Sequence, residues 1–407
     1  MTARIVITGM GIVNASGIGV EPFWRSVSAG RLAIRAISRF DASTFPVRVA
    51  GEVDCGDALK SLPRRLVNKT DRFAHFALIA TAEAIASAQI KLDRIDREKA
   101  GVWFGNNSGG WDIHEQGLRE LSELGPRMVN PWQATSWFPT AAQGHTSILH
   151  QLFGNSKSFV ADRASGAGAI VFGLRSIRQG QNHMVLAGGT EAPITSLGVA
   201  CYYASGDLVA AVDPHGAYRP FDARRCGLVL GEGSAVLVLE DLEHALARKA
   251  PILAEIKGAR ITTDSDPGRG RALERGMRMA LQEARLRPID IDLVFAEGAG
   301  SPVHDRVEAE AMENVWGGDS DKIVVTVPKS LYGHGYGASG ATEIICGILA
   351  ARTRRLPPTA GYEVGDPGCR VRPIGVPREA TVKNFMVNAR SRNGVNVSIV
   401  VEASSQE

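Results

Sequence analysis

The chain has 407 residues, of which 44% are hydrophobic and 22% charged, a composition typical of a large folded protein rather than a disordered or fibrous one. Its 46 basic and 43 acidic side chains leave a formal charge of only +3, which gives no field for binding nucleic acid or a membrane surface. Five scattered cysteines support neither a disulfide framework nor a metal site, and they predict reduced thiols in a cytoplasmic protein.

The chain opens with residues 4–8 (RIVIT), which predict a buried strand, followed by GMGIVNASGIG, which predicts a tight turn. Gly9 and Gly11 match part of a dinucleotide fingerprint, but Asn14 stands where the third glycine or alanine belongs. A dinucleotide-dependent oxidoreductase is therefore an alternative with weak support. The start of the chain lacks the basic region of a signal peptide, and no apolar run approaches the roughly 18 residues that span a bilayer.

An amphipathic helix is predicted over residues 71–88 and a core strand over residues 100–105. The glycine-rich segment after this strand leads into a helix that carries Trp111, His114 and Leu118 at one-turn spacings. Residues spaced in this way lie on one helix face. Such a stripe most often packs in a core, and the alternative is the wall of a pocket or an interface.

A strand-to-helix elbow follows at residues 159–180, where a short apolar strand end meets a helix rich in glycine and alanine. Folds often display a nucleophile at such an elbow, because the unpaired N–H groups of the helix start stabilise an anion. Here the displayed residue is Arg163. A guanidinium stays protonated and has no nucleophilic electron pair, so the elbow lacks the chemistry that its shape suits.

Pro251 marks the predicted boundary between two halves, residues 1–250 and 251–407. Strands and helices alternate in both halves, and this pattern predicts α/β layers in a duplicated fold. The predicted strands of the second half are 253–261, 293–296, 322–327 and 397–402. Its predicted helices are 270–285, 306–315 and 340–354.

Four further stretches lie at predicted junctions between strands, loops and helices, where open α/β folds assemble their sites. They read RPFDARRCGLVLGEG, AEGAGSPVHDRVEAEAM, VPKSLYGHGYGASGATEI and NARSRNGVNVSI. Together with the elbow, and in matching order across nearly the whole chain, they resemble the β-ketoacyl synthase family. The resemblance implies the thiolase fold, a duplicated αβαβα architecture with two mixed five-stranded sheets.

The resemblance also implies that the catalytic site is not intact. In condensing members a Cys at the elbow takes the acyl chain and two His support decarboxylation of malonyl carrier protein; the Cys position falls on Arg163 and the first His on Glu297. The second His is kept as His334, and the Lys before it as Lys329. A carboxylate at position 297 would repel a thioester enolate. Because a helix start disfavours a cation, we expect Arg163 and Glu297 to form an ion pair in the old centre.

Within the family, the chain looks most like the chain-length factor, or ketosynthase β subunit, of type II polyketide synthases. Those subunits lack the catalytic Cys, usually have Gln there, and form a heterodimer with an active ketosynthase. The resemblance makes Trp111, His114 and Leu118 the wall of the chain tunnel, with residues 132–138 as a possible extension of it, and makes Arg392 and Asn393 the counterpart of a Gly-Phe-Gly-Gly gate.

A chain-length factor binds no cofactor of its own, because the growing chain is presented on the phosphopantetheine of an acyl carrier protein. The resemblance therefore implies a ketosynthase and an acyl carrier protein as partners, and no activity of the chain outside an acyltransferase complex. Arg163 in place of Gln and the retained His334 depart from the subgroup pattern. The remaining alternative is a stand-alone homodimeric decarboxylase or hydrolase of the thiolase fold that uses His334 and Glu297.

Overall fold

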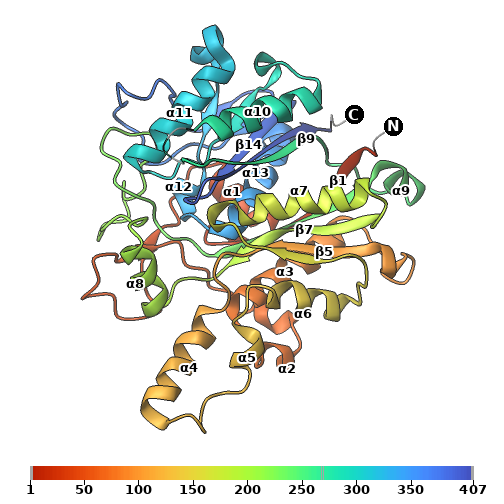
Figure 1. Ribbon diagram of the computed structural model, residues 1–407, viewed down its shortest axis with the longest axis vertical. Helices are drawn as coiled ribbons and strands as arrows, with labels where there is room; N and C mark the ends of the chain where they lie inside the picture. Colours follow the sequence, from red (N-terminus) through yellow and green to blue (C-terminus); the bar gives the residue numbers. More distant parts are fainter. Residues whose placement is uncertain (1–2, 267, 269, 405–407) are drawn as a thin grey trace.

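The computed structural model describes residues 3–266, 268 and 270–404, and its main feature is one long sheet (Figure 1). The strand order is β11-β10-β14-β15-β9-β1-β8-β7-β5-β6, with β2 (Gly17–Ile18) beside β1. The first half supplies β1 (Ile5–Asn14), β5 (Ala100–Gly105), β6 (Lys157–Phe159), β7 (Met184–Glu191) and β8 (Gly233–Asp241). The second half supplies β9 (Ala254–Thr263), β10 (Leu293–Phe295), β11 (Val325–Thr326), β14 (Asn384–Arg390) and β15 (Val395–Ala403).

The two halves of the sheet have the same topology. Numbered along the chain, the five strands of each half lie in the order third, second, fourth, fifth, first. The third, second and fourth strands are parallel, and the fifth runs antiparallel to both of its neighbours, the fourth and the first. The halves meet where β1 and β9 pair over three residues, from Ile5↔Ile256 to Ile7↔Ala254. The predicted pair of mixed five-stranded sheets is confirmed, and the structure adds that they are joined edge to edge. The boundary at Pro251 stays a prediction.

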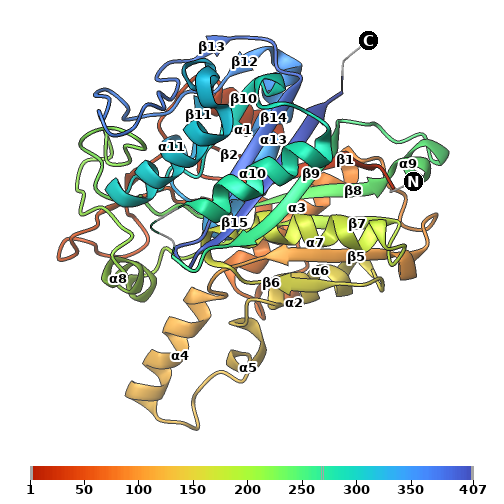
Figure 2. The same ribbon diagram turned by 45° about the horizontal axis from the view of Figure 1, so that its top comes forward.

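Helices form three layers around the two half-sheets (Figure 2). Two central helices, α7 (Ser165–Arg178) and α13 (Ser339–Thr353), share one apolar core with the inner faces of both half-sheets. The outer face of the first half packs on α3 (Arg72–Ser87), with α6 (Ala141–His150) beside it. The outer face of the second half packs on α10 (Arg271–Ala284) and α11 (Pro302–Trp316). The predicted αβαβα layering is therefore confirmed.

Shorter elements connect these layers. The helices among them are α1 (Val20–Val27), α2 (Arg64–Val67), α8 (Ser196–Ala204), α9 (Leu242–Ala247) and α12 (Lys329–Tyr332). Two small two-stranded antiparallel sheets pair β3 (Arg35–Ala36) with β4 (Val49–Ala50) and β12 (Arg355–Leu356) with β13 (Arg378–Glu379). Of the helices in the described part of the chain, none combines the length and the apolar character that crossing a membrane would need.

The first strand runs further than predicted, because Gly9, Gly11 and Asn14 lie in β1, and the turn predicted within GMGIVNASGIG is confined to Ala15 and Ser16. A Cβ added at Gly9 would come within 2.4 Å of the Ala84 carbonyl oxygen, and one at Gly11 within 2.0 Å of the Ala80 carbonyl oxygen. The glycines therefore let α3 pack directly on the strand. A dinucleotide fingerprint needs a turn at the end of a strand, so the structure removes the basis of the oxidoreductase hypothesis.

One helical arm projects away from the layers in both views (Figures 1 and 2). It consists of α4 (Trp111–Leu124), α5 (Gln133–Ser136) and the loop between them. Gly117 is the one buried residue of α4, whereas Leu118 is 45% exposed. The interpretation of this stripe as core is therefore wrong for Leu118, whereas Trp111 is partly buried and packs against an apolar cluster that includes Tyr202.

Candidate functional site

The elbow is built as predicted, from β6 through a short 3-10 turn, η3 (Asp162–Ala164), into α7. The Ser165 hydroxyl accepts a hydrogen bond from the Ala161 N–H and donates one to the Asp162 carbonyl, which closes the turn. A Cβ at Gly166 would lie 1.9 Å from the Gly337 carbonyl oxygen. The glycine-rich sequences of both segments thus allow the backbone of the second half to pass directly over the elbow.

The structure brings together the four residues assigned to the old catalytic centre. Arg163 comes from η3, Glu297 follows β10, Lys329 begins α12, and His334 precedes the 3-10 turn η6 (Tyr336–Ala338). Their side chains are at most 3% exposed. Four segments from both halves therefore bring together the cations Arg163 and Lys329, the Glu297 carboxylate and the His334 imidazole in one buried cluster.

His334 is engaged at both ring nitrogens. Its Nδ1 accepts the Tyr336 backbone N–H at 3.0 Å, so in the neutral ring the proton is on Nε2, which lies 2.7 Å from Glu297 Oε1. Burial lowers the pKa of His334, although the Glu297 carboxylate opposes that shift. The ring is therefore neutral near pH 7, and its one N–H is already donated to protein.

Glu297 is also surrounded by the two cations. Its Oε2 lies 3.7 Å from Lys329 Nζ, and its Oε1 lies 3.8 Å from Arg163 Nε. Burial opposes ionisation, but Lys329, His334 and Arg163 outweigh it and hold the pKa of Glu297 well below its usual range. The expected Arg163–Glu297 ion pair is present, as a charge contact rather than a hydrogen bond, and the closest partner of Glu297 is His334.

Two acidic residues that sequence reasoning missed complete the centre. Glu343 lies in the largely buried α13, ahead of its apolar run, and its Oε1 lies 2.6 Å from Lys329 Nζ. Glu308, on α11, accepts the backbone N–H groups of Glu297 and Gly298 at 2.8 and 2.9 Å. A carboxylate inside an apolar helix is itself a sequence signal for a buried ion pair, and it could have identified Glu343.

The elbow position carries no nucleophile. No thiol or hydroxyl occupies the elbow position, the guanidinium of Arg163 cannot give up a proton, and His334 donates its proton to Glu297. A substrate carbonyl would also face the ionised Glu297 instead of a hydrogen-bond donor, the reverse of an oxyanion hole. The centre is a buried electrostatic network.

The gate-equivalent residues lie at a small hollow beside the elbow. Arg392 and Asn393 line it together with Trp111 and Asp162, and its volume is about 260 Å³. The Arg392 backbone N–H donates to Asp162 Oδ2 at 2.6 Å, and its guanidinium contacts the Ser205 carbonyl. These contacts hold the loop of residues 391–394 against the elbow.

The tunnel-wall residues separate into two groups. Trp111 and His114 are half-buried with ring centroids 6.5 Å apart, and His114 lies 5.7 Å from Trp137 of the predicted wall extension. Leu118 lies on the outer surface of α4, where it joins an exposed apolar face. Trp111 borders the hollow and His114 lies next to it, whereas Leu118 can act only if a second chain covers this face.

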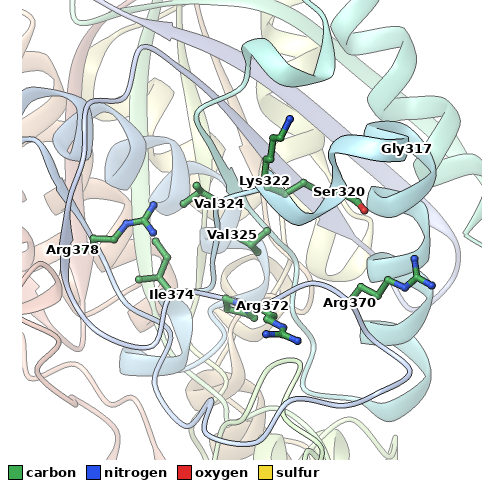
Figure 3. Close-up of a pocket in the computed structure, with 12 residues that line it drawn as sticks. Gly317, Ser320, Lys322, Val324, Val325, Arg370, Arg372, Ile374 and Arg378 are labelled. Atoms are coloured by element: carbon green, nitrogen blue, oxygen red, sulfur yellow. The ribbon is translucent and has the colours of Figure 1, made fainter.

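A larger hollow of about 950 Å³ lies elsewhere, between the 3-10 turn η5 (Gly317–Lys322), β11 and the segment that leads from β12 into β13 (Figure 3). Arg370, Arg372 and Arg378 line it, and it shares no residue with the charged centre. Over the described ranges, no group of three or more His, Cys, Asp or Glu side chains could hold a metal ion.

Comparison with known protein families matches two consecutive families to this chain. The β-ketoacyl synthase N-terminal domain covers residues 2–245, and the β-ketoacyl synthase C-terminal domain covers residues 253–363.

Individual proteins match over the full length. The tetracenomycin polyketide synthase ketoacyl synthase beta subunit of Streptomyces glaucescens is 38% identical over 403 residues, 98% of each chain. The 3-oxoacyl-[acyl-carrier-protein] synthase 2 of Coxiella burnetii is 34% identical over 98% of each chain. Among solved structures, the ishigamide ketosynthase/chain length factor superposes with a TM-score of 0.90 at 29% identity and covers 100% of both chains.

Proposed function

The chain belongs to the β-ketoacyl synthase family, and from this premise we propose that it is a non-catalytic chain-length factor of a type II polyketide synthase. One observation carries the proposal: Arg163 occupies the position of the reactive thiol, and its guanidinium is buried against the Glu297 carboxylate. The relatives include both a ketoacyl synthase beta subunit and a condensing synthase, and the loss of thiol and imidazole together favours the beta subunit.

We further propose that the chain pairs with an active ketosynthase through β6 and the surface around it. β6 ends the sheet and has a neighbour on one side only, β5, so its outer edge can accept a strand. Large apolar side chains are exposed around this edge and along the projecting arm: Leu118, Leu121, Leu124, Met128, Trp137, Phe138, Ile148, Phe153 and Val160. An apolar face of this extent marks an interaction site, and the similar ishigamide protein is a ketosynthase/chain length factor.

In this arrangement the partner's active site carries out condensation on a chain held by the phosphopantetheine of an acyl carrier protein. This subunit shapes the tunnel into which the chain extends. Trp111 and His114 are placed to narrow that tunnel, because Trp111 borders the hollow and the His114 ring beside it leads toward the interface face. The five cysteines of the chain are all free, which suits the reducing cytoplasm in which such an assembly would work.

The test is reconstitution with a ketosynthase and its acyl carrier protein. We expect no condensation by the lone chain, and we expect Trp111→Ala to lengthen the products of the pair, while Trp111→Phe, which keeps a ring, stays close to the native distribution. An unchanged distribution for Trp111→Ala in an intact heterodimer would contradict the chain-length role. Decarboxylation of malonyl carrier protein by the lone chain, lost in His334→Gln, would instead establish the stand-alone enzyme.

A further inference from the structure

A row of aromatic rings connects the charged centre to the projecting arm. From the inside outward its members are His334, Tyr336, Tyr202, Trp111, His114, Trp137 and Phe138, with successive ring centroids 4.5 to 6.5 Å apart. The inner members His334 and Tyr336 are fully buried, whereas the outermost, Phe138, is 43% exposed. The row therefore leads from the buried charged centre to the exposed apolar face on the projecting arm, which we assign to the partner.

Tyr336 is held in place from two sides. Its backbone N–H donates to His334 Nδ1 at 3.0 Å, and its hydroxyl donates to Asp207 Oδ2 at 3.1 Å. Its φ of +41° is in the left-handed region, which is unfavourable for an aromatic residue and persists only where the surroundings enforce it. The backbone is thus constrained to direct a large ring into the space beside the old centre.

Tyr202, on α8, supports this ring from the outer side. The two ring centroids are 4.7 Å apart. The Tyr202 hydroxyl accepts a hydrogen bond from Asn107 Nδ2 at 2.8 Å and donates to Ser108 Oγ at 3.3 Å. A buried tyrosine whose hydroxyl is satisfied cannot rotate away without losing those bonds, so the pair of rings is a fixed barrier.

On its inner side the hollow ends at Tyr202 and Asp207, and Tyr336 lies directly behind both of them. Trp111, Tyr202 and Asp207 line it, and Asp207 also accepts the Tyr336 hydroxyl. Arg163, Glu297 and His334 do not line it. The two tyrosines therefore separate a space that Trp111 borders from the charged centre behind them.

We propose that Tyr336, supported by Tyr202, is an inner stop for the growing chain. It limits how far a chain that passes Trp111 extends toward the old centre, and it keeps an acyl chain away from the buried charges there. This inference rests on the proposed chain-length function and deepens it, because it assigns to this chain a second residue, besides Trp111, that sets product length.

The barrier can be tested on the lone chain, without a partner. Tyr336→Cys would remove the ring behind Tyr202 and Asp207 and leave a thiol in the space that opens to the hollow. We expect methyl methanethiosulfonate to label one more cysteine in that variant than in the native chain, counted by intact mass. Tyr332→Cys is the matched control, because Tyr332 is equally buried but packs against Phe23 in the central core, and it should add no label. If Tyr336→Cys takes up no additional label, or if both variants are labelled equally, the proposal that Tyr336 is an inner stop is wrong.

The consequence for product length can be tested in the reconstituted pair. We expect Tyr336→Leu to lengthen the products by at least one extension unit, and Tyr332→Leu to leave them unchanged. If Trp111→Ala shifts the products and neither Tyr336→Leu nor Tyr202→Leu does so, the stop is wrong and the proposed function stands. If none of the three shifts them in an intact heterodimer, the chain-length function itself fails.

Discussion

Glu297 Oε1 lies 2.7 Å from His334 Nε2, and this contact occupies the one proton that a neutral His334 could offer to a substrate. The other ring nitrogen accepts the Tyr336 N–H. The retained histidine is therefore part of the network that closes the site, and its presence alone does not preserve the family's chemistry.

Restoring the thiol alone should not restore condensation. In Arg163→Cys the new thiol would face the Glu297 carboxylate, and both burial and that negative charge raise a thiol pKa and disfavour the nucleophilic thiolate. We expect no acyl-enzyme in the intact mass after incubation with acyl carrier protein loaded with an acyl chain. The double variant Arg163→Cys, Glu297→His removes the carboxylate and should become acylated. Acylation of the single variant would show that Glu297 does not prevent the chemistry.

Removing the charge of Glu297 should destabilise the fold strongly. Glu297→Gln leaves Arg163 and Lys329 buried beside a neutral amide, and loss of one partner from a buried charge network costs about 3 to 5 kcal/mol. Glu363→Gln is the control, because its 2.7 Å contact with Arg224 is exposed at the surface and is worth at most about 1 kcal/mol. Urea denaturation measures both changes. Equal effects would mean that the buried network contributes little to stability.

A charge on the apolar face should weaken the heterodimer. Ile148, on α6, is 74% exposed, and Ile148→Asp would bury an unpaired carboxylate in the proposed interface. We expect at least about a tenfold weaker association, or roughly 1.4 kcal/mol, in titration calorimetry with the ketosynthase. Val376→Asp makes the same change at a side chain that is 70% exposed on a loop outside the proposed interface, and it should not alter the affinity. Equal losses from both variants would argue against this interface.

His75 should make the protein sensitive to acid. Burial in α3 lowers the pKa of His75 to about 4, below its ordinary value near 6.5, so the unfolded chain binds this proton more readily. Stability is then full above pH 6.5, declines as the pH falls toward 4, and loses on the order of 3 kcal/mol from this group. His75→Gln should flatten this part of the curve of unfolding free energy against pH. An unchanged slope would assign the acid sensitivity to other groups.

Close packing of α3 on β1 should make Gly11 intolerant of a side chain. Gly11→Ala would place a Cβ 2.0 Å from the Ala80 carbonyl oxygen, and relief requires the helix to move, which typically costs about 1 to 3 kcal/mol. Gly144→Ala meets nothing within 4 Å and lies inside α6, where alanine is the better helix former by about 1 kcal/mol. We expect opposite changes in thermal unfolding temperature. A neutral Gly11→Ala would show that the interface between β1 and α3 can expand.

Periodicity was enough to find most of the layers, because strands and amphipathic helices leave local apolar patterns. The helix at 71–88 and the strand at 100–105 coincide with α3 and β5 to within a residue or two. β1 extends past its predicted end because Gly9 and Gly11 are glycines that serve a tertiary contact, and sequence alone does not distinguish these from the glycines of a turn. The strand β14 was not predicted, although one of its partners, β15, begins only five residues after it; the other, β10, is distant in the chain.

The site was predictable as far as its four aligned positions, and the residues that surround them were not. Asp207 and Tyr336 are separated by 129 positions, so only the folded chain shows that they meet. Periodicity alone left the stripe on α4 open between a core and a wall, because an apolar side chain gives the same signal whether it faces its own core or a second chain.

The two ends of the sheet differ in one respect that concerns assembly. At β11 the neighbouring segment contributes Pro373, bridged to Val325, and proline has no N–H to offer a further strand. The outer edge of β6 has no such cover among the described residues. A strand from another chain can therefore be added only at β6. Once a partner strand pairs with β6, the sheet has no free edge at which a further chain could be added. The topology itself favours a closed pair over an open-ended fibre.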